Sequence, residues 1–457
     1  MPDLSKIVKA YDVRGTVPDQ LNTDVARALG AAVITVTGAT KLAAGHDMRE
    51  SGPELLAAFA AGATSQGADV VNIGLASTDL LYFASGQLDL PGAMFTASHN
   101  PARYNGIKLC RAGAQPIGQD SGLVDIRKIA QGYLDDGLPA DAQQIGVVSE
   151  TNLLGEYAGY LRGLVDLSAS RPLKVVVDAG NGMGGYTVPA VLGDQLLPGL
   201  PLEIVPLYFE LDGNFPNHEA NPLEPANLVD LQKAVIAEQA DIGLAFDGDA
   251  DRCFFIDANG DAVSPSAVTA LVAVRELAKA PGSAVIYNLI TSSAVPEVIR
   301  EHGGRPIRTR VGHSFIKAEM AATDAVFGGE HSAHYYFRNF WRADTGMLAA
   351  MHVLAALGEQ PGSLAELTAG YSRYSDSGEI NSEVVDQAGR IEAISQYYRA
   401  KGASFDHLDG LTITLPDGNW LNVRASNTEP LLRLNVEAGS TAEMQSIRDE
   451  ALSVIRA

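Results

Sequence analysis

The sequence predicts an α/β protein with three similar mixed α/β domains, followed by a smaller α+β domain at its C-terminal end. One observation behind this prediction is a strand–helix–strand pattern that recurs at 42–74, 173–209 and 283–311. The other is a change of pattern in the C-terminal part, where consecutive strands replace that unit. Because strand–helix–strand units favour parallel pairing and a right-handed crossover, each repeat predicts its own sheet.

The length supports this organisation. The chain has 457 residues, of which 46% are hydrophobic and 19% charged, an ordinary globular mixture. At roughly 150 residues per domain this length suggests about three domains, with two or four as alternatives. A long α/β chain can also show such a pattern without repeated domains. We expect domain I at 1–150, domain II at 151–256, domain III at 257–368 and domain IV at 369–457.

Each repeat is justified by its own residues. In the first, the helix-forming run PELLAAFAAGATSQG precedes the strand ADVVNIG, which ends at residue 74. In the second, the β-branched run LKVVVD precedes a glycine-rich turn, an apolar helix near 187–197 and the strand LEIVPLYF. In the third, SAVIYNL and RPIRTRV flank a helix that ends at a Gly-Gly pair.

The C-terminal region predicts a different layout. LTITLPDGNWLNV is typical of two strands joined by a Pro-Asp-Gly turn, and LLRLNVEA is a third strand. A helix follows, with Ser440 or Thr441 as its N-cap and Glu443 in its first turn. The polar segment 366–382 is a candidate linker.

Composition excludes some functions. Lys and Arg total 33 against 55 Asp and Glu, so the net charge is −22 at pH 7. Such a field repels phosphate backbones and anionic membranes, which argues against a general nucleic-acid or membrane binder. Two cysteines, Cys110 and Cys253, form no disulfide framework, and no run resembles a signal peptide or a membrane span. We expect a cytoplasmic protein.

The segment 247–252 reads DGDADR and follows the apolar run at 240–246, so it is expected at the carboxyl end of a strand, where open α/β sheets bind ligands. Its carboxylates belong to Asp247, Asp249 and Asp251. They repel one another unless a cation compensates them, and hard oxygen ligands favour Mg²⁺. An EF-hand is excluded, because Arg252 and Ala258 stand where Gly and Glu are needed. A solvated acidic turn is the alternative.

The segment TASHNP at 96–101 also follows an apolar run, and Ser98 is a candidate nucleophile or phosphate carrier. The alternative is simple turn chemistry. A serine hydrolase is disfavoured, because the run around Ser98, with Ala97 and His99 as its neighbours, is not a G-x-S-x-G motif. Downstream, Lys108 could act as a general acid or base, or could be a surface lysine at a strand edge.

The segment RASNTEP at 424–430 offers a guanidinium, two hydroxyls and an amide in a loop between strands. These groups belong to Arg424, Ser426, Asn427 and Thr428. They suit a phosphate dianion, because a guanidinium can donate two hydrogen bonds to it and short polar side chains can donate others. A polar hairpin loop is the alternative.

Further polar residues follow other strands. In an extended segment, Glu330, Ser332 and His334 would share one face, and they suit sugar hydroxyls. His331 and His334 could instead be a metal pair or ordinary strand residues, although they match no zinc template. His313 follows a predicted strand.

Arg14 precedes Gly15 at a predicted early turn. Its guanidinium could bind a phosphate, cap a helix or pair with Asp12.

The ordered set of motifs resembles the α-D-phosphohexomutase family, and within it the bacterial phosphomannomutase/phosphoglucomutase group. The motifs are YDVRG, TASHNP, NGIKL, DGDADR, VGHSFIK, GEHSAH and RASNTEP, which span residues 11–430. The segments VDAGNGMGG and DGNFPNHEANPLEP also look like family segments. Two positions depart from the pattern: Ala333 stands where Gly is common, and His46 where Arg is common.

The resemblance implies four domains around a central cleft and assigns roles to the candidate residues. Ser98 would be the phosphoserine, with Lys108 as general base, His313 as a second candidate, and Arg14 and Arg252 near the transferring group. The metal ligands would be Ser98 through its phosphate, Asp247, Asp249 and Asp251. Substrate would be bound by Tyr11, His99, Gly312, Glu330, Ser332, His334, Arg424, Ser426, Asn427 and Thr428.

The implied activity is that of a phosphomannomutase working through a hexose 1,6-bisphosphate with Mg²⁺, and glucose phosphates are further candidate substrates. Phosphoglucomutase and phosphoglucosamine mutase are alternatives, and His331 argues mildly against the latter. An aspartate-dependent phosphatase is disfavoured, since Asp251 stands where its motif has Thr. A non-enzymatic sugar-phosphate binder leaves Ser98 and Lys108 unexplained. We expect a small-molecule partner and a monomer or homodimer.

Overall fold

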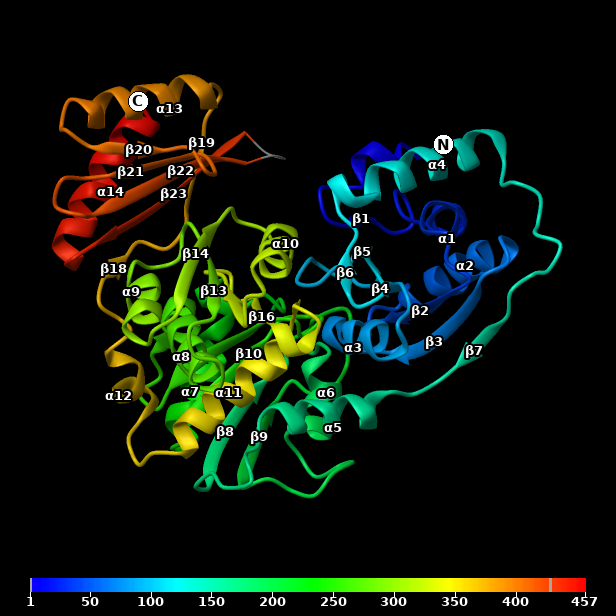
Figure 1. The fold of residues 1–457 in the computed structure, drawn as a ribbon, viewed down its shortest axis with the longest axis horizontal. Helices are drawn as coiled ribbons and strands as arrows, with labels where there is room; N and C mark the ends of the chain where they lie inside the picture. The colour runs from blue at the N-terminus through cyan, green and yellow to red at the C-terminus, as the bar shows by residue number, and fades with distance from the viewer. Residues whose placement is uncertain (1, 427–429) are drawn as a thin grey trace. The chain divides into compact units, whose positions relative to one another are not determined.

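The computed structural model describes residues 2–426 and 430–457, and it divides into two compact units. Unit 1 comprises Met1–Val263 and Ser332–Leu367, and unit 2 comprises Ser264–His331 and Thr368–Ala457. Figure 1 shows the chain running from blue at its N-terminus to red at its C-terminus, with helices and sheets alternating along most of its length. The α/β class predicted from the sequence is confirmed.

The first sheet of unit 1 has the order β1-β5-β4-β2-β3-β7, with β6 on the edge of β5. Its strands are β1 (Val13–Thr16), β2 (Lys41–His46), β3 (Asp69–Leu75), β4 (Gly92–Phe95), β5 (Tyr104–Arg111), β6 (Gln115–Pro116) and β7 (Val148–Glu150). Its helices are α1 (Thr23–Thr37), α2 (Gly52–Ser65), α3 (Thr78–Leu88) and α4 (Leu123–Asp136). Strands β3, β2 and β4 run parallel, as the first repeat predicts, whereas β5 is antiparallel to β4.

The second sheet of unit 1 has the order β12-β11-β10-β8-β9. Its strands are β8 (Leu173–Asp178), β9 (Leu202–Leu207), β10 (Ile242–Phe246), β11 (Cys253–Asp257) and β12 (Ala262–Val263). The helices of this part of unit 1 are α5 (Leu154–Leu164), α6 (Gly184–Val191) and α7 (Val229–Glu238). Strands β8, β9 and β10 are parallel, so their carboxyl ends meet at one edge of the sheet. Unit 1 also contains β16 (Tyr335–Phe337), β17 (Ala343–Asp344) and α11 (Gly346–Gly358).

Unit 2 contains the third repeat and the C-terminal sheet. The repeat consists of α8 (Pro265–Lys279), β13 (Ala284–Asn288), α9 (Ala294–Glu301), β14 (Arg305–Thr309), α10 (His313–Thr323) and β15 (Phe327–Gly329), with β13 parallel to both β14 and β15. The C-terminal sheet has the order β18-β23-β22-β21-β20, with β19 also on β23. Its strands are β18 (Ser375–Asp376), β19 (Ile380–Glu383), β20 (Ser404–Asp406), β21 (Leu411–Thr414), β22 (Trp420–Ala425) and β23 (Leu431–Ala438).

The C-terminal sheet packs its apolar side against α13 (Gln387–Arg399) and α14 (Thr441–Ile455). Figure 1 shows both helices beside this sheet. Ser440 caps α14, since its hydroxyl accepts the N–H of Glu443. The candidate linker at 366–382 contains the boundary between the two units, after Leu367. It is not without regular structure: helix α12 (Leu364–Ala369) enters it, and β18 and β19 both pair with β23, because a polar strand needs only one apolar face to join a sheet edge.

Candidate active site

The loop after β4 places Ser98 in a constrained position. Ser98 has φ +49°, a left-handed conformation that non-glycine residues rarely adopt, and it is 4% exposed. Its N–H donates to Thr96 Oγ1 at 2.9 Å, and its hydroxyl donates to Asp247 Oδ2 at 2.9 Å. Arg252 Nη2 donates to the same hydroxyl at 3.1 Å. The structure therefore sets the serine oxygen between a carboxylate and a guanidinium.

Three buried carboxylates follow β10. Asp247, Asp249 and Asp251 are each at most 1% exposed, and one oxygen of each lies within 4.8 Å of the others. Strand β10 directs them to the carboxyl edge of the second sheet, because its backbone is fixed on both sides by β8 and β11. Ala250, at φ +59°, turns the chain so that alternate residues face inwards. The predicted position of this motif at the end of a strand is confirmed.

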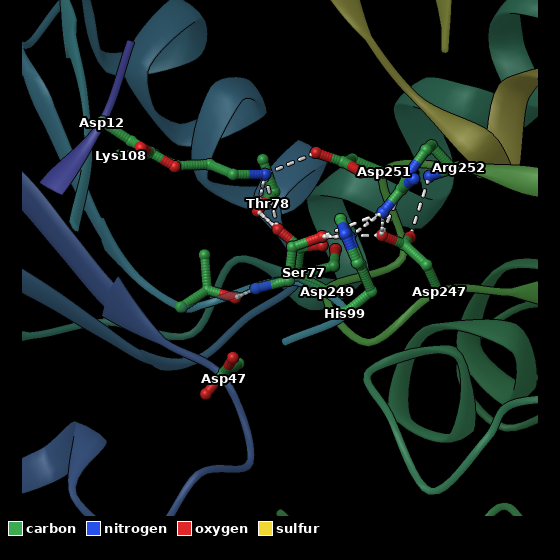
Figure 2. A network of polar contacts seen from close by, with 12 residues as sticks. Asp12, Asp47, Ser77, Thr78, His99, Lys108, Asp247, Asp249, Asp251 and Arg252 are labelled. Carbon is green, nitrogen blue, oxygen red and sulfur yellow. Dashed lines mark hydrogen bonds and ion pairs between the residues drawn. The ribbon is translucent and has the colours of Figure 1, made fainter. Parts of the chain in front are cut away.

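Two cations partly compensate these carboxylates. Lys108 Nζ donates to Asp249 Oδ2 and Asp251 Oδ2, both at 2.6 Å, and Arg252 Nη2 donates to Asp247 Oδ2 at 2.7 Å. Figure 2 shows Lys108 and Arg252 converging on the carboxylates from different sides. Three carboxylates and two cations give a formal net charge of −1. Burial raises the pKa of Asp247 to about 8 despite Arg252, and a further cation beside the cluster would stabilise its charged form.

The donor set fits a hard divalent ion. Asp249 Oδ1 and Asp251 Oδ1 are buried and accept no hydrogen bond from any residue that the structure describes. Buried carboxylate oxygens without a donor are costly, and a divalent cation such as Mg²⁺ satisfies them. Burial favours the neutral form of Asp249, but Lys108 outweighs it and holds the pKa of Asp249 below its usual value.

Lys108 lies on an interior strand, because β5 pairs with β1 and β4. The interpretation of this residue as a surface lysine at a strand edge is therefore wrong. Burial opposes its charge, but Asp249 and Asp251 raise its pKa above the usual value. As it lies here, Lys108 is a protonated ammonium.

His99 is a neutral imidazole beside Arg252. Burial and the charge of Arg252 lower the pKa of His99 to about 2, so its Nδ1 accepts a hydrogen bond from the guanidinium. The same nitrogen lies 3.1 Å from Ser98 Oγ. His99 therefore orients Arg252 towards the serine without adding charge.

Arg14 lies on β1, not at a turn, because β1 pairs with β5 through Arg14 and Gly106. Its guanidinium bonds to Asp12 Oδ2 and to Asn100 Oδ1. Of the three interpretations drawn from the sequence, the pair with Asp12 is the one formed here. The contact with Asn100 also brings Arg14 to the loop that carries Ser98. Tyr11 lies just before β1.

The segment from Glu330 to His334 is not extended, so the condition for a shared face is not met. The chain turns after β15, with Ala333 at φ +62°, so the three polar residues do not alternate along one strand. Ser332 Oγ lies 3.0 Å from His334 Nδ1, and His334 Nε2 lies 3.9 Å from Asp251 Oδ1. The left-handed turn also explains why glycine suits position 333.

Glu330 belongs to unit 2, whereas Ser332 and His334 belong to unit 1. In unit 2, Glu330 Oε2 accepts hydrogen bonds from Asn288 Nδ2 at 3.2 Å and from the N–H of Gly312 at 3.3 Å. Helix α10 begins at His313, whose side chain lies outside the part of the structure that is described.

Arg424 is the last residue but one of β22 in unit 2, where Glu379 at 3.1 Å and Asp409 at 3.9 Å are its carboxylate partners. Ser426 donates its backbone N–H to the carbonyl of Leu431. Asn427 and Thr428 lie outside the described residues. The arginine is thus 8% exposed and positioned at the start of the predicted phosphate loop.

Family models account for most of the chain. Those of the phosphoglucomutase/phosphomannomutase α/β/α domains I, II and III match residues 5–133, 156–260 and 264–374, and that of the C-terminal domain matches 379–454. The chain belongs to the phosphoglucomutase/phosphomannomutase family. It is therefore a phosphohexomutase, an isomerase that works by phosphoryl transfer. The boundaries predicted after residues 150, 256 and 368 stay predictions.

Individual relatives agree with the family. The chain is 41% identical over 449 residues to a Xanthomonas campestris protein named phosphohexose mutases, covering 97% of this chain and 98% of the relative. It is 38% identical over 452 residues to an Escherichia coli phosphomannomutase, covering 98% of each. A Burkholderia thailandensis phosphoglucomutase/phosphomannomutase family structure has a TM-score of 0.88 at 32% identity, covering 100% of this chain and 98% of that one.

Several residues of this phosphohexomutase site escaped sequence reasoning. Thr78 donates its hydroxyl to Asp249 Oδ2 at 2.5 Å and its backbone N–H to the Asp249 carbonyl oxygen at 3.0 Å. Asp47 and Arg49 follow β2 and lie near the serine loop. Thr78 follows β3, and Asp47 and Arg49 follow β2. Their position after a parallel strand of the first sheet could have marked them as candidate site residues in the sequence. Across residues 2–426 and 430–457, no helix has both the length and the apolar character needed to cross a bilayer.

Proposed function

We propose that this phosphohexomutase interconverts mannose 1-phosphate and mannose 6-phosphate through a phosphoserine at Ser98. The observation that carries the proposal is the position of Ser98 Oγ, 2.9 Å from Asp247 Oδ2 and 3.1 Å from Arg252 Nη2. A phosphoryl group on that oxygen would meet a fixed guanidinium and a carboxylate cluster suited to a divalent cation. Relatives from Escherichia coli that are named phosphomannomutase support mannose phosphates as substrates. Glucose phosphates are further candidate substrates, because the family name also includes phosphoglucomutase.

The proposed reaction has two transfers. In the first, the P–O bond to Ser98 breaks as a bond forms to a free hydroxyl of the hexose monophosphate, which gives a hexose 1,6-bisphosphate. That hydroxyl loses its proton as the Ser98 oxygen leaves. In the second, Ser98 takes the other phosphate, and the monophosphate isomer is released with no net loss of phosphate. Phosphoryl transfer depends mainly on positioning and electrostatics, which preformed charges supply.

The residues of this chain have distinct proposed roles. Arg252, oriented by neutral His99, offsets charge on the transferring group, and Arg14 approaches the same loop through Asn100. Asp247, Asp249 and Asp251 would hold Mg²⁺, which supplies further charge stabilisation when bound. Sugar hydroxyls and the distant phosphate would be held by Tyr11, Gly312, Glu330, Ser332, His334, Arg424, Ser426, Asn427 and Thr428.

Lys108 is the proposed proton-transfer group, and His313 is the second candidate. In the structure the Lys108 ammonium lies 2.6 Å from two carboxylate oxygens. A general base must be neutral when it acts. The role therefore requires that a cation replace the ammonium at those oxygens. In the present geometry burial opposes the charge of Lys108, but Asp249 and Asp251 raise the pKa of Lys108 and so hold its proton.

The test compares substrates. The enzyme is incubated with Mg²⁺, a trace of hexose 1,6-bisphosphate, and mannose 1-phosphate, glucose 1-phosphate or glucosamine 1-phosphate, and the 6-phosphate is measured. Highest kcat/KM for mannose 1-phosphate supports the proposal. Preference for glucose or glucosamine 1-phosphate would assign one of the alternative mutases. An active Ser98→Ala variant would contradict the phosphoserine.

A further inference from the structure

The Arg49 guanidinium lies beneath the loop that carries Ser98. Its Nη2 donates to the carbonyl oxygens of Ser98 at 2.9 Å and Asn100 at 2.6 Å. Its Nη1 donates to the carbonyl oxygens of Pro101 at 3.0 Å and Tyr104 at 2.8 Å. Four carbonyls from one short stretch of chain therefore converge on a single side chain that is 1% exposed.

The buried charge of Arg49 is compensated on its remaining sides. Its Nε lies 3.3 Å from Asp47 Oδ2, and Asp47 is fully buried. The ring of Phe215 lies 5.2 Å from the guanidinium carbon, a cation–π distance. Gly213 approaches so closely that an added Cβ would lie 2.9 Å from Arg49 Cα. Burial lowers the pKa of Arg49, but an arginine starts so far above neutrality that it stays charged.

The loop needs such support because its central residue is strained. A left-handed φ costs a residue other than glycine about 1–2 kcal/mol, and the surroundings must hold it. The Ser98 carbonyl oxygen also lies against Gly248, since an added Cβ on Gly248 would be 2.4 Å away. The Ser98 carbonyl oxygen therefore accepts a hydrogen bond from Arg49 and also contacts Gly248, in the loop of the three carboxylates.

We propose that Arg49 is a positioning residue for phosphoryl transfer. Its hydrogen bonds to the carbonyls of Ser98, Asn100, Pro101 and Tyr104, called the clamp below, fix the loop of Ser98 against the loop of Asp247, Asp249 and Asp251. The clamp rests on the proposed function, in which Ser98 carries the phosphate. Arginine is required because its planar fork supplies four Nη N–H groups, one for each carbonyl, while its charge lies beside the Asp47 carboxylate, whose Oδ2 is 3.3 Å from Nε. Lysine offers three donors from one point and cannot span the four carbonyls.

The decisive variant is Arg49→Lys, which keeps the charge and loses the fork. A displacement of the loop by about 1 Å lowers the transfer rate about 100-fold. We expect kcat, and the rate at which hexose 1,6-bisphosphate phosphorylates Ser98, to fall together by about 30- to 100-fold. The dissociation constant for the sugar monophosphate, measured by calorimetry, should change by less than about threefold, because the polar contacts of Arg49 go to backbone carbonyls of the serine loop and Tyr104 and to Asp47.

Arg162→Lys is the matched control. The Arg162 guanidinium also donates to three backbone carbonyls, those of Val191, Gly193 and Pro198, and all three lie away from the serine loop. The two substitutions therefore remove the same kind of interaction at different places. Both should lower the thermal unfolding midpoint. Only Arg49→Lys should lower kcat and Ser98 phosphorylation, whereas Arg162→Lys should stay within about twofold of wild type.

Should Arg49→Lys fail to fold, Phe215→Leu removes the ring beside the clamp and leaves its donors in place; a fall in Ser98 phosphorylation of about 3- to 10-fold is then expected. Folded Arg49→Lys with a wild-type phosphorylation rate would overturn the clamp, as would Phe215→Leu with an unchanged rate when Arg49→Lys is unfolded. Equal losses of kcat in Arg162→Lys would also overturn it. Wild-type enzyme that never carries phosphate on Ser98 would overturn the proposed function and the clamp together.

Discussion

Gly248→Ala tests how closely the carboxylate loop must approach the serine loop. The φ of Gly248 lies outside the left-handed range, so its backbone accepts alanine. The added Cβ, however, would lie 2.4 Å from the Ser98 carbonyl oxygen, where ordinary contact begins at 3.4 Å. The contact is too short by 3.4 − 2.4 = 1.0 Å, and because the contacted atom is a backbone oxygen, the backbone must move by that amount. The substitution therefore separates the two loops without removing a polar group.

The expected effects follow from that separation. A misplacement of about 1 Å costs about 100-fold in rate, which is about 2.7 kcal/mol in the activation free energy. Overpacking should also lower the free energy of unfolding by about 1–3 kcal/mol. The assay measures kcat at saturating sugar phosphate and the unfolding midpoint of the same preparation. Ser98 itself is unchanged, so residual activity should still depend on its phosphorylation.

Gly159→Ala is the control for this prediction. Gly159 is an exposed residue of α5, and an added Cβ meets no atom within 4 Å. Alanine there should raise the free energy of unfolding by about 0.5–1 kcal/mol and leave kcat unchanged. Gly248→Ala with a kcat within about threefold of wild type would refute the reasoning, because the loops would then tolerate separation.

Three further predictions concern other residues. Burial of the His218 ring opposes its charge, but Asp178 at 2.9 Å raises the pKa of His218 above its reference of 6.5. The ion pair therefore stabilises the fold fully below that reference, and its contribution is lost as pH rises through the folded pKa. The difference in unfolding midpoint between wild type and His218→Gln should shrink towards high pH, and a constant difference would contradict this. Ala333→Gly should relieve its left-handed φ and raise the unfolding free energy by about 1 kcal/mol in chemical denaturation, whereas a loss would refute it. Asp249→Asn should weaken Mg²⁺ binding in calorimetry by at least about tenfold, and unchanged affinity would exclude Asp249 as a ligand.

The sequence predicted the parts of the fold that local pattern determines. Strands β8 and β13 are β-branched or apolar runs followed by turns, and their parallel partners follow from the intervening helices. The position of Asp247 at the end of β10 could be predicted for the same reason. Family membership was recognisable because the motifs keep their order along the chain.

Features that depend on tertiary packing were missed. Alternation would place Glu330, Ser332 and His334 on one face only in an extended segment, and the Glu-His-Ser-Ala-His pattern gives no sign of the left-handed turn at Ala333. Strands β18 and β19 are polar and short, and they exist because β23 offers them an edge. The carbonyl contacts of Arg49 join residues about fifty positions apart, so no spacing rule predicts them.

The central claim is that Ser98 passes its phosphate to the sugar. The most direct test loads the enzyme with ³²P on Ser98, adds excess unlabelled mannose 1-phosphate with Mg²⁺, and follows the label. The account predicts that label leaves Ser98 and appears first in hexose 1,6-bisphosphate and then in mannose 6-phosphate. Label that is released as free phosphate, or that stays on the protein while mannose 6-phosphate accumulates, would contradict it.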